Sequence, residues 1–153
     1  MIQRRTLLLA GTAALAGCAS LTPAAIASDV QLVATGVQAL APLLGPLGVP
    51  AATIAQVVAL AADVSAHVTS IGSVVSSLTP PSNVAAIVTD VNAIATMVNP
   101  FTMNAAVGGQ VYTILVAAQA LLPAIEAAAG LPVPTGAAPG MSPDDARSLL
   151  KSL

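Results

Sequence analysis

Apolar residues recur along this chain at alternating spacings of three and four, the period that places side chains on one face of an α-helix. The alternation is longest between residues 50 and 78. Its positions there are Ile54, Val57, Ala61, Val64, Val68, Ile71, Val75 and Leu78. The same seam recurs in the segments 29–44, 82–98 and 102–129. The pattern therefore predicts four amphipathic helices.

Proline and glycine separate these segments and place their ends. Gly45-Pro46 follows the first segment, Thr79-Pro80-Pro81 the second and Asn99-Pro100 the third, while Gly130 is a good residue to follow the fourth. Short links between consecutive helices favour antiparallel neighbours. We therefore expect an all-α fold, a small antiparallel four-helix bundle over residues 29–130.

Capping residues and prolines refine the expected helices. Asp29 is positioned to cap the first helix, and Pro123 is expected to kink the last turns of the fourth. Residues 131–141 read as a Pro/Gly linker. Ser142-Pro143 then has the form of a helix start, so residues 131–153 are predicted to be a linker and a short amphipathic tail helix from Pro143 to Leu153.

The apolar content comes from small side chains. Hydrophobic residues make up 56% of the chain but aromatic residues only 1%, namely Phe101 and Tyr112. A core of alanine and valine buries little area per residue, so its margin over conformational entropy is thin. We expect close helix approach at alanines, apolar surface left for a partner, or both of these. We also expect both aromatic rings to be anchored in the core.

The N-terminus has the layout of an export signal. Arg4 and Arg5 precede an apolar run that extends from Leu7 to about Ala16, too short to cross a bilayer. It ends in Leu15, Ala16, Gly17 and Cys18, the one cysteine of the chain. This segment resembles bacterial lipoprotein signal peptides. The resemblance implies that residues 1–17 are removed and that Cys18 is acylated, with residues 18–28 as a lipidated tether.

The same resemblance implies an address. The protein would be held in the cell envelope, on a membrane facing the periplasm, and Ala19 after the cysteine favours the outer membrane. Arg4-Arg5-Thr6 also partly matches a twin-arginine export signal, and general secretion remains the alternative. Cleavage before Ser28, after Ala25-Ile26-Ala27, would instead release a protein without Cys18.

Charge is scarce and unevenly placed. Beyond the signal, the basic residues are Arg147 and Lys151, against six acidic residues, so there is no basic patch and nucleic-acid binding is excluded. Residues 30–62 and 91–125 contain no charged side chain. That absence raises the alternative that some helices enter a bilayer, although the polar stripe along each segment favours a soluble bundle.

Few residues offer chemistry. Asp63 and His67 are one helical turn apart, but a zinc site needs three or four ligands, so a solvated pair is expected. Four acids occur about once per segment and are expected on outer faces. They are Asp29, Asp63, Asp90 and Glu126. Gly108-Gly109 lacks the lysine of a phosphate loop, and no serine-nucleophile motif is present. We predict no catalysis, no cofactor and no metal.

These observations favour a membrane-anchored lipoprotein with a structural or accessory role, acting through a protein partner or through self-association. One alternative is a small accessory subunit of a periplasmic membrane-bound complex, such as an oxidoreductase. Another is a membrane-inserting, pore-like protein. Beyond its signal the chain resembles uncharacterised Ala-rich exported proteins, and that resemblance implies no activity.

Overall fold

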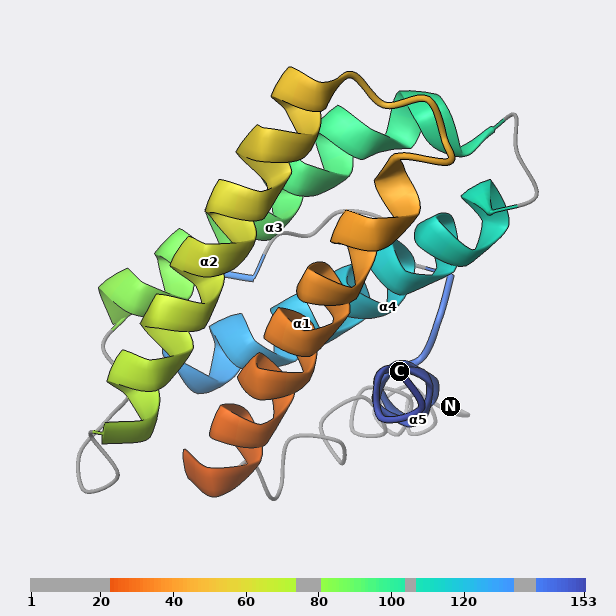
Figure 1. Cartoon of the computed structure of the whole chain (residues 1–153). Helices are drawn as coiled ribbons and strands as arrows, with labels where there is room; N and C mark the ends of the chain where they lie inside the picture. Colours follow the sequence, from red (N-terminus) through yellow and green to blue (C-terminus); the bar gives the residue numbers. More distant parts are fainter. Residues whose placement is uncertain (1–22, 74–80, 104–106, 134–139) are drawn as a thin grey trace, which may run out of the picture.

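The computed structural model describes residues 23–73, 81–103, 107–133 and 140–153, and within these ranges the chain is all-helical. The four long helices are α1 (Pro23–Leu44), α2 (Ala51–Ser73), α3 (Pro81–Thr102) and α4 (Gly108–Ala128). A short helix, α5 (Pro143–Leu150), lies near the C-terminus. The prediction of a small four-helix bundle with a C-terminal tail helix is confirmed (Figure 1).

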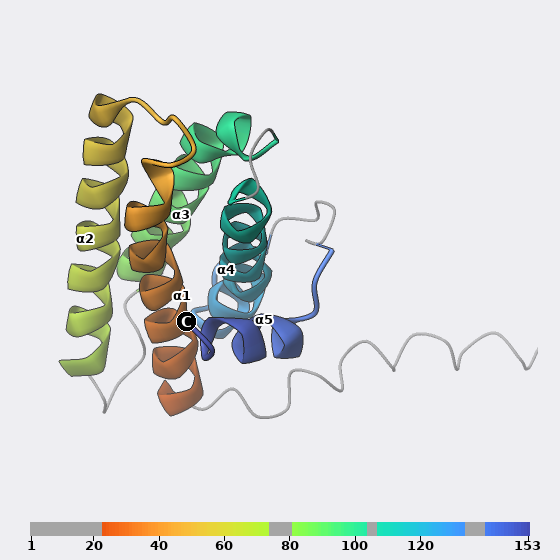
Figure 2. The ribbon, with the colours of Figure 1, turned by 45° about the vertical axis from the view of Figure 1, so that its right-hand side comes forward.

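Consecutive long helices run antiparallel and close into a ring. Contacts join α1 to α2, α2 to α3, α3 to α4 and α4 back to α1. Figure 2 shows the link between α1 and α2 at the same end of the bundle as the link between α3 and α4. Helix α5 packs across α1 and α4, away from that end (Figure 2).

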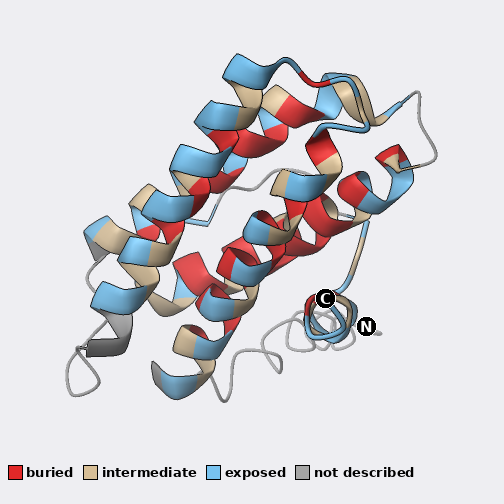
Figure 3. Cartoon of the chain, in the orientation of Figure 1, coloured by how far each residue is buried: buried red, intermediate tan, exposed pale blue. Residues whose placement is uncertain are grey.

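The predicted seams form the core, and Figure 3 shows the buried residues as inward stripes along the long helices. Every seam position of α1 and α3 is fully buried; these are Val30, Val33, Val37, Leu40, Leu44, Val84, Ile87, Val91, Ile94 and Val98. In α2 the buried seam is shorter, comprising Val57, Ala61 and Val64, with Ile54 and Val68 half-buried. The seam residues Val75 and Leu78 and the side chain of Ile71 lie outside the described part of the chain.

Helix α1 begins at Pro23, earlier than the expected start at Asp29. Proline is favourable in the first helical turn because its φ is already helical and it has no amide donor to leave unpaired. Ile26, one turn before Val30, is buried in the core and extends the apolar stripe. Residues 23–28 of the expected tether are therefore the first turns of the bundle, and Asp29 is inside the helix instead of capping it.

Two expected boundaries around the link from α3 to α4 were also wrong. Helix α3 continues through Pro100 to Thr102, because a proline in the last turn removes only one backbone hydrogen bond. The Thr102 hydroxyl donates to the Asn99 carbonyl across 2.9 Å, which supports that turn. Helix α4 begins at Gly108 instead of near Thr102, and it continues through Pro123 to Ala128.

The ends of α4 and α5 follow the sequence signals. Gly130 has φ of 72°, the left-handed conformation that glycine adopts without strain. The amide of Leu131 donates to the Glu126 carbonyl across 2.9 Å, which closes a Schellman motif. At the start of α5 the Ser142 hydroxyl accepts from the Asp145 amide at 3.2 Å. Helix α5 ends at Leu150, one turn short of the expected Leu153.

The two glycines at the start of α4 have opposite surroundings. A Cβ built on Gly108 would overlap the carbonyl oxygen of Thr102, which is backbone and has little freedom to move. A Cβ on Gly109 would have no neighbour within 4 Å. Gly108 is therefore required for the close approach of α4 to the end of α3, and Gly109 is not.

This contrast gives a matched pair of substitutions. Gly108→Ala should lower the free energy of unfolding by about 1–3 kcal/mol, the usual range for a forced steric overlap. Gly109→Ala should leave it unchanged or raise it by about 0.4–1 kcal/mol, since alanine restricts the unfolded chain. Urea denaturation followed by circular dichroism measures both. Equal effects of the two substitutions would contradict the close approach at Gly108.

Candidate functional sites

The expected export and acylation residues lie outside the described part of the chain. They are Arg4, Arg5, Leu15, Ala16, Gly17 and Cys18. The described residues therefore leave the signal, the acylation and the cleavage position as predictions. Asp29, Asp63, His67, Asp90 and Glu126 all lie in described helices.

Asp29 and Arg147 form a two-pronged ion pair that joins α1 to α5. The Nε of Arg147 donates to Oδ1 of Asp29 and its NH2 group donates to Oδ2, both across 2.8 Å. The side chain of Asp29 is 5% exposed and that of Arg147 is 28% exposed. The NH1 group of Arg147 also donates to Asp144 across 2.7 Å. The hydrogen bond with Asp29 raises the pKa of the Arg147 guanidinium, which therefore stays charged.

The expectation that Asp29 faces outward was wrong. Because α1 begins at Pro23, Asp29 lies within the helix, one turn from the buried Ile26 on one side and the buried Val33 on the other, and shares their face. A buried carboxylate is costly unless it is paired and hydrogen-bonded. The planar guanidinium of Arg147 matches both carboxylate oxygens at once, so the pair has defined geometry.

Apolar contacts hold α5 beside this pair. Ala146 and Leu150 of α5 are buried. A Cβ on Gly36 of α1 would lie 2.6 Å from Cδ2 of Leu150 and 3.6 Å from Cγ2 of Ile114, so Leu150 occupies the space over that glycine. The expected docking of the tail helix on the bundle is found for Leu149, which is half-buried, and for Leu150, while Leu153 is exposed.

Glu126 is the second acid whose expected outer position was wrong. The residue is 8% exposed, near the C-terminus of α4, and burial raises the pKa of its carboxyl. The ion pairs found among the described residues are the two made by Arg147, so Glu126 has no cationic partner there. Its charge therefore opposes folding at neutral pH.

Asp63 and His67 of α2 lie near Asp90 of α3. Burial and the nearby Asp63 raise the pKa of the Asp90 carboxyl, and the nearby His67 lowers it by a smaller amount. Asp63 is exposed, while His67 and Asp90 are half-buried. Within the described ranges, no group of three or more His, Cys, Asp or Glu side chains is arranged to hold a metal ion.

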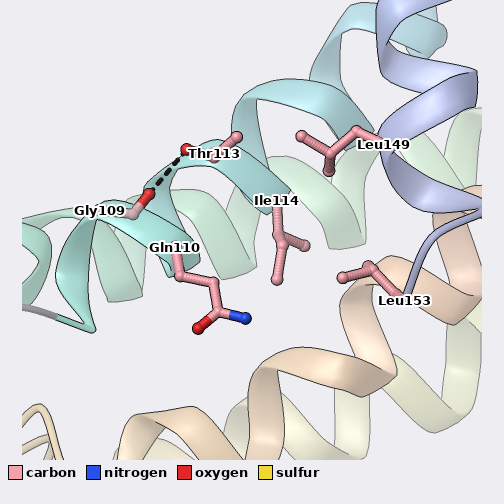
Figure 4. A pocket seen from close by; sticks show the side chains of 6 residues that line it. All are labelled: Gly109, Gln110, Thr113, Ile114, Leu149 and Leu153. Carbon is pink, nitrogen blue, oxygen red and sulfur yellow. Dashed lines mark hydrogen bonds between the residues drawn. The ribbon is translucent and has the colours of Figure 1, made fainter.

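Two surface pockets flank α4. One, of about 330 Å³, lies between the first turns of α4 and the C-terminus, and Figure 4 shows Ile114, Leu149 and Leu153 among its lining residues. The other, of about 480 Å³, lies between the end of α3 and α4, beside Pro100, Met103 and Tyr112. Neither lining contains an acidic, basic or histidine residue.

The aromatic residues do not both anchor the core. Phe101 is half-buried and packs against the core, but Tyr112 is 53% exposed, so its expected burial was wrong. Tyr112 immediately follows the buried seam residue Val111, and a step of one residue along a helix turns the side chain by about 100°. Met103 beside the link from α3 to α4 is 87% exposed.

The described residues form a small helical bundle with a largely apolar core, a partly buried ion pair between Asp29 and Arg147, and a buried Glu126. Comparison with protein-family models, with curated proteins and with solved structures finds no match for this chain. Four of its helices contain runs of 20 or 21 residues that are long and apolar enough to cross a membrane by length and composition. The bundle is therefore compatible with membrane association.

The ion pair predicts how α5 responds to substitution. Arg147→Gln should leave Asp29 buried without a cation, which costs about 1.5–3 kcal/mol of stability. Because Asp29 regains water when α5 detaches from the bundle, α5 should detach more often in this variant. Hydrogen exchange at the Ala146 and Leu150 amides should then be roughly 10 to 100 times faster, while α3 amides keep their protection. Lys151→Gln is the control, since Lys151 is exposed and makes no ion pair among the described residues. Unchanged exchange in Arg147→Gln would contradict a fastening role for the pair.

Glu126 predicts a pH dependence of stability. Because its pKa is raised in the folded protein, the folded state binds more protons than the unfolded state above pH 4.5, the ordinary value for glutamate. Stability should therefore fall as the pH rises from about 4.5 through the raised pKa. Glu126→Gln should be more stable than the parent at pH 7 and should lack this component of the decline. Denaturant titrations of both chains from pH 4 to pH 8 measure the difference, and parallel curves would show that Glu126 is not responsible.

Proposed function

We propose that this protein is an exported lipoprotein, anchored through acylated Cys18, that acts by contact with another protein and not by catalysis. The observation that supports this most is the run Leu15-Ala16-Gly17-Cys18, which has the form read by lipoprotein processing. The acyl chains hold the protein to the membrane facing the periplasm, with the outer membrane favoured by Ala19.

The start of α1 supports a short connection between anchor and body. Cys18 precedes Pro23 by five residues, and an extended chain of that length spans at most about 17 Å. The N-terminal end of α1, with Asp29 and the docked α5, would therefore stay close to the anchored membrane. In this arrangement the bundle is tethered at one end, and the exposed faces of its helices are available to meet a partner.

The distribution of chemical groups supports a contact role over an enzymatic one. Arg147 and Asp29 satisfy each other, and the two pockets beside α4 have no ionisable lining except Tyr112. A general base needs a substrate site within hydrogen-bond reach. His67 is the one histidine of the chain, and it lines neither of these two pockets.

A second candidate function is membrane insertion as a pore-like protein, favoured by the four apolar helices. The two candidates differ in which residues meet lipid. A photoreactive lipid probe would label all four long helices along their length in an inserted protein. In the anchored protein it would label the N-terminal peptide and, at most, one end of the bundle.

Acylation has a direct test. Mass spectrometry of the N-terminal peptide, isolated from the native host, should show a chain that begins at Cys18 with the added mass of the acyl groups. Cys18→Ser should abolish both the acyl mass and cleavage at that position. Gly17→Ala is the control, since it keeps a small residue before the cysteine and should leave processing intact. A mature chain that begins at Ser28, or an unmodified Cys18, would refute the proposal.

A further inference from the structure

The antiparallel topology places the middle of each uncharged stretch at one end of the bundle, and the stretches extend from there along most of α1 and α4. Residues 30–62 span most of α1, its link to α2 and the first half of α2, and residues 91–125 span the corresponding parts of α3 and α4. Both links lie at the same end (Figure 2). We call the described part of these two stretches, residues 30–62, 91–103 and 107–125, the uncharged end. Asp29, Asp63, Asp90 and Glu126 all lie outside it.

The tip of the uncharged end exposes large apolar side chains. Met103 is 87% exposed and Tyr112 is 53% exposed, on either side of the link between α3 and α4. Phe101 and Leu47 are half-buried there, and the first turn of α2 exposes Ala52. The pocket of about 480 Å³ beside Met103 and Tyr112 opens at the same place. Aromatic rings with one polar atom are typical of the boundary between hydrocarbon and water.

Many polar side chains of this end are partnered within the protein. The hydroxyls of Thr35, Thr96 and Thr113 each donate to the carbonyl one turn earlier, across 3.0, 2.9 and 2.7 Å. Hydrogen bonds between helices join Gln38 to Ser65 and Gln119 to Asn92. A polar group that is already hydrogen-bonded loses less when it leaves water. These bonds lower the cost of bringing the uncharged end against an apolar medium.

From this charge segregation we propose that the tip of the uncharged end binds the interfacial region of a lipid bilayer, with Met103 and Tyr112 entering it. A lipid surface fits better than a protein surface because protein interfaces retain charged residues at their rims, whereas this end has none over either stretch. Contact is shallow: Asn99 and Gln110 are exposed near the tip and lie at headgroup level. This contact follows from the described fold and does not depend on acylation of Cys18.

In the acylated protein, this contact sets the orientation of the bundle. Helix α1 of 22 residues is about 33 Å long, with the anchor near its first residue and the tip beyond its last. Both ends meet the same bilayer only when the bundle lies along its surface. The proposed anchor and the uncharged end would then be two separate attachments to one membrane.

Single tryptophans test the contact, because the chain contains no tryptophan of its own. The full chain with Cys18→Ser, which carries no acyl group, is mixed with vesicles of phosphatidylcholine that contains brominated acyl chains. Fluorescence of a Tyr112→Trp variant should shift to the blue and be quenched several-fold more than that of Ser148→Trp, an exposed position on α5. Added salt should change neither result, since no charge is involved.

A matched pair of aspartates tests the same surface in the opposite direction. Ala52 and Ala66 are both exposed on α2, four helical turns apart on one face. With the Tyr112→Trp reporter, Ala52→Asp should weaken vesicle binding about tenfold, because a carboxylate resists withdrawal from water. Ala66→Asp, beyond Asp63, should leave it within twofold. Circular dichroism confirms that both variants fold.

Three results would overturn the proposal. One is equal quenching at positions 112 and 148, which would place no special end at the bilayer. Another is the absence of quenching at position 112. The third is a blue shift without vesicles that grows with protein concentration, which would show that a second copy of the chain covers the tip. Because the chain tested lacks the acylated cysteine, each result is independent of whether Cys18 is modified in the native host.

Discussion

Close packing of small apolar side chains is the constraint on which the rest of this structure depends. Six of the ten fully buried seam residues of α1 and α3 are valines, and a valine contributes less buried area than leucine or phenylalanine would. Such a core is stable only if the helices approach closely and every seam position is filled. The requirement explains why Gly108 packs against the carbonyl of Thr102 and why Gly36 leaves space for Leu150.

The same constraint explains the role of α5. A thin core gains from any additional apolar contact, and Ala146 and Leu150 add two buried side chains against α1 and α4. A helix of 8 residues has little stability of its own. Its Ser142 cap and the ion pair between Arg147 and Asp29 supply what its length cannot. The pair also fixes where α5 docks, since a guanidinium engages both oxygens of a carboxylate in one orientation.

The periodic part of this structure was predictable from sequence, and the pairings were not. Helical periodicity places Val84, Ile87 and Val91 on one face whatever surrounds them, so the four-helix fold and most of its core followed. The sequence predicted Asp29 to be a helix cap because a short polar residue before an apolar run is a typical N-cap. Its actual partner, Arg147, lies 118 residues away in the sequence, so no local pattern indicated the pair. The predicted exposure of Glu126 and the predicted burial of Tyr112 were wrong because, at the edge of an apolar stripe, neither polarity nor aromatic character decides whether a side chain is buried. Pro23, as a favourable first-turn residue, was the signal that would have moved the start of α1 and turned Asp29 inward.

The placement of charge links the packing to the proposed membrane role. Antiparallel helices bring segments that are far apart in the sequence to the same end of a bundle. Two uncharged stretches can therefore form one uncharged surface without being neighbours in the sequence. Charge elsewhere is then needed for solubility, and it falls on α5, on the middle of α2 and α3 and near the ends of α1 and α4. Glu126 shows that this charge carries a cost, because burial raises its pKa without an ion-pair partner among the described residues. The small apolar side chains of the core leave little free energy of unfolding to spare. A destabilising carboxylate is therefore tolerated more easily away from the surface that is proposed to leave water than within that surface. The segregation of charged residues is therefore explained better by the proposed contact between the uncharged end and a bilayer than by the stability of the bundle.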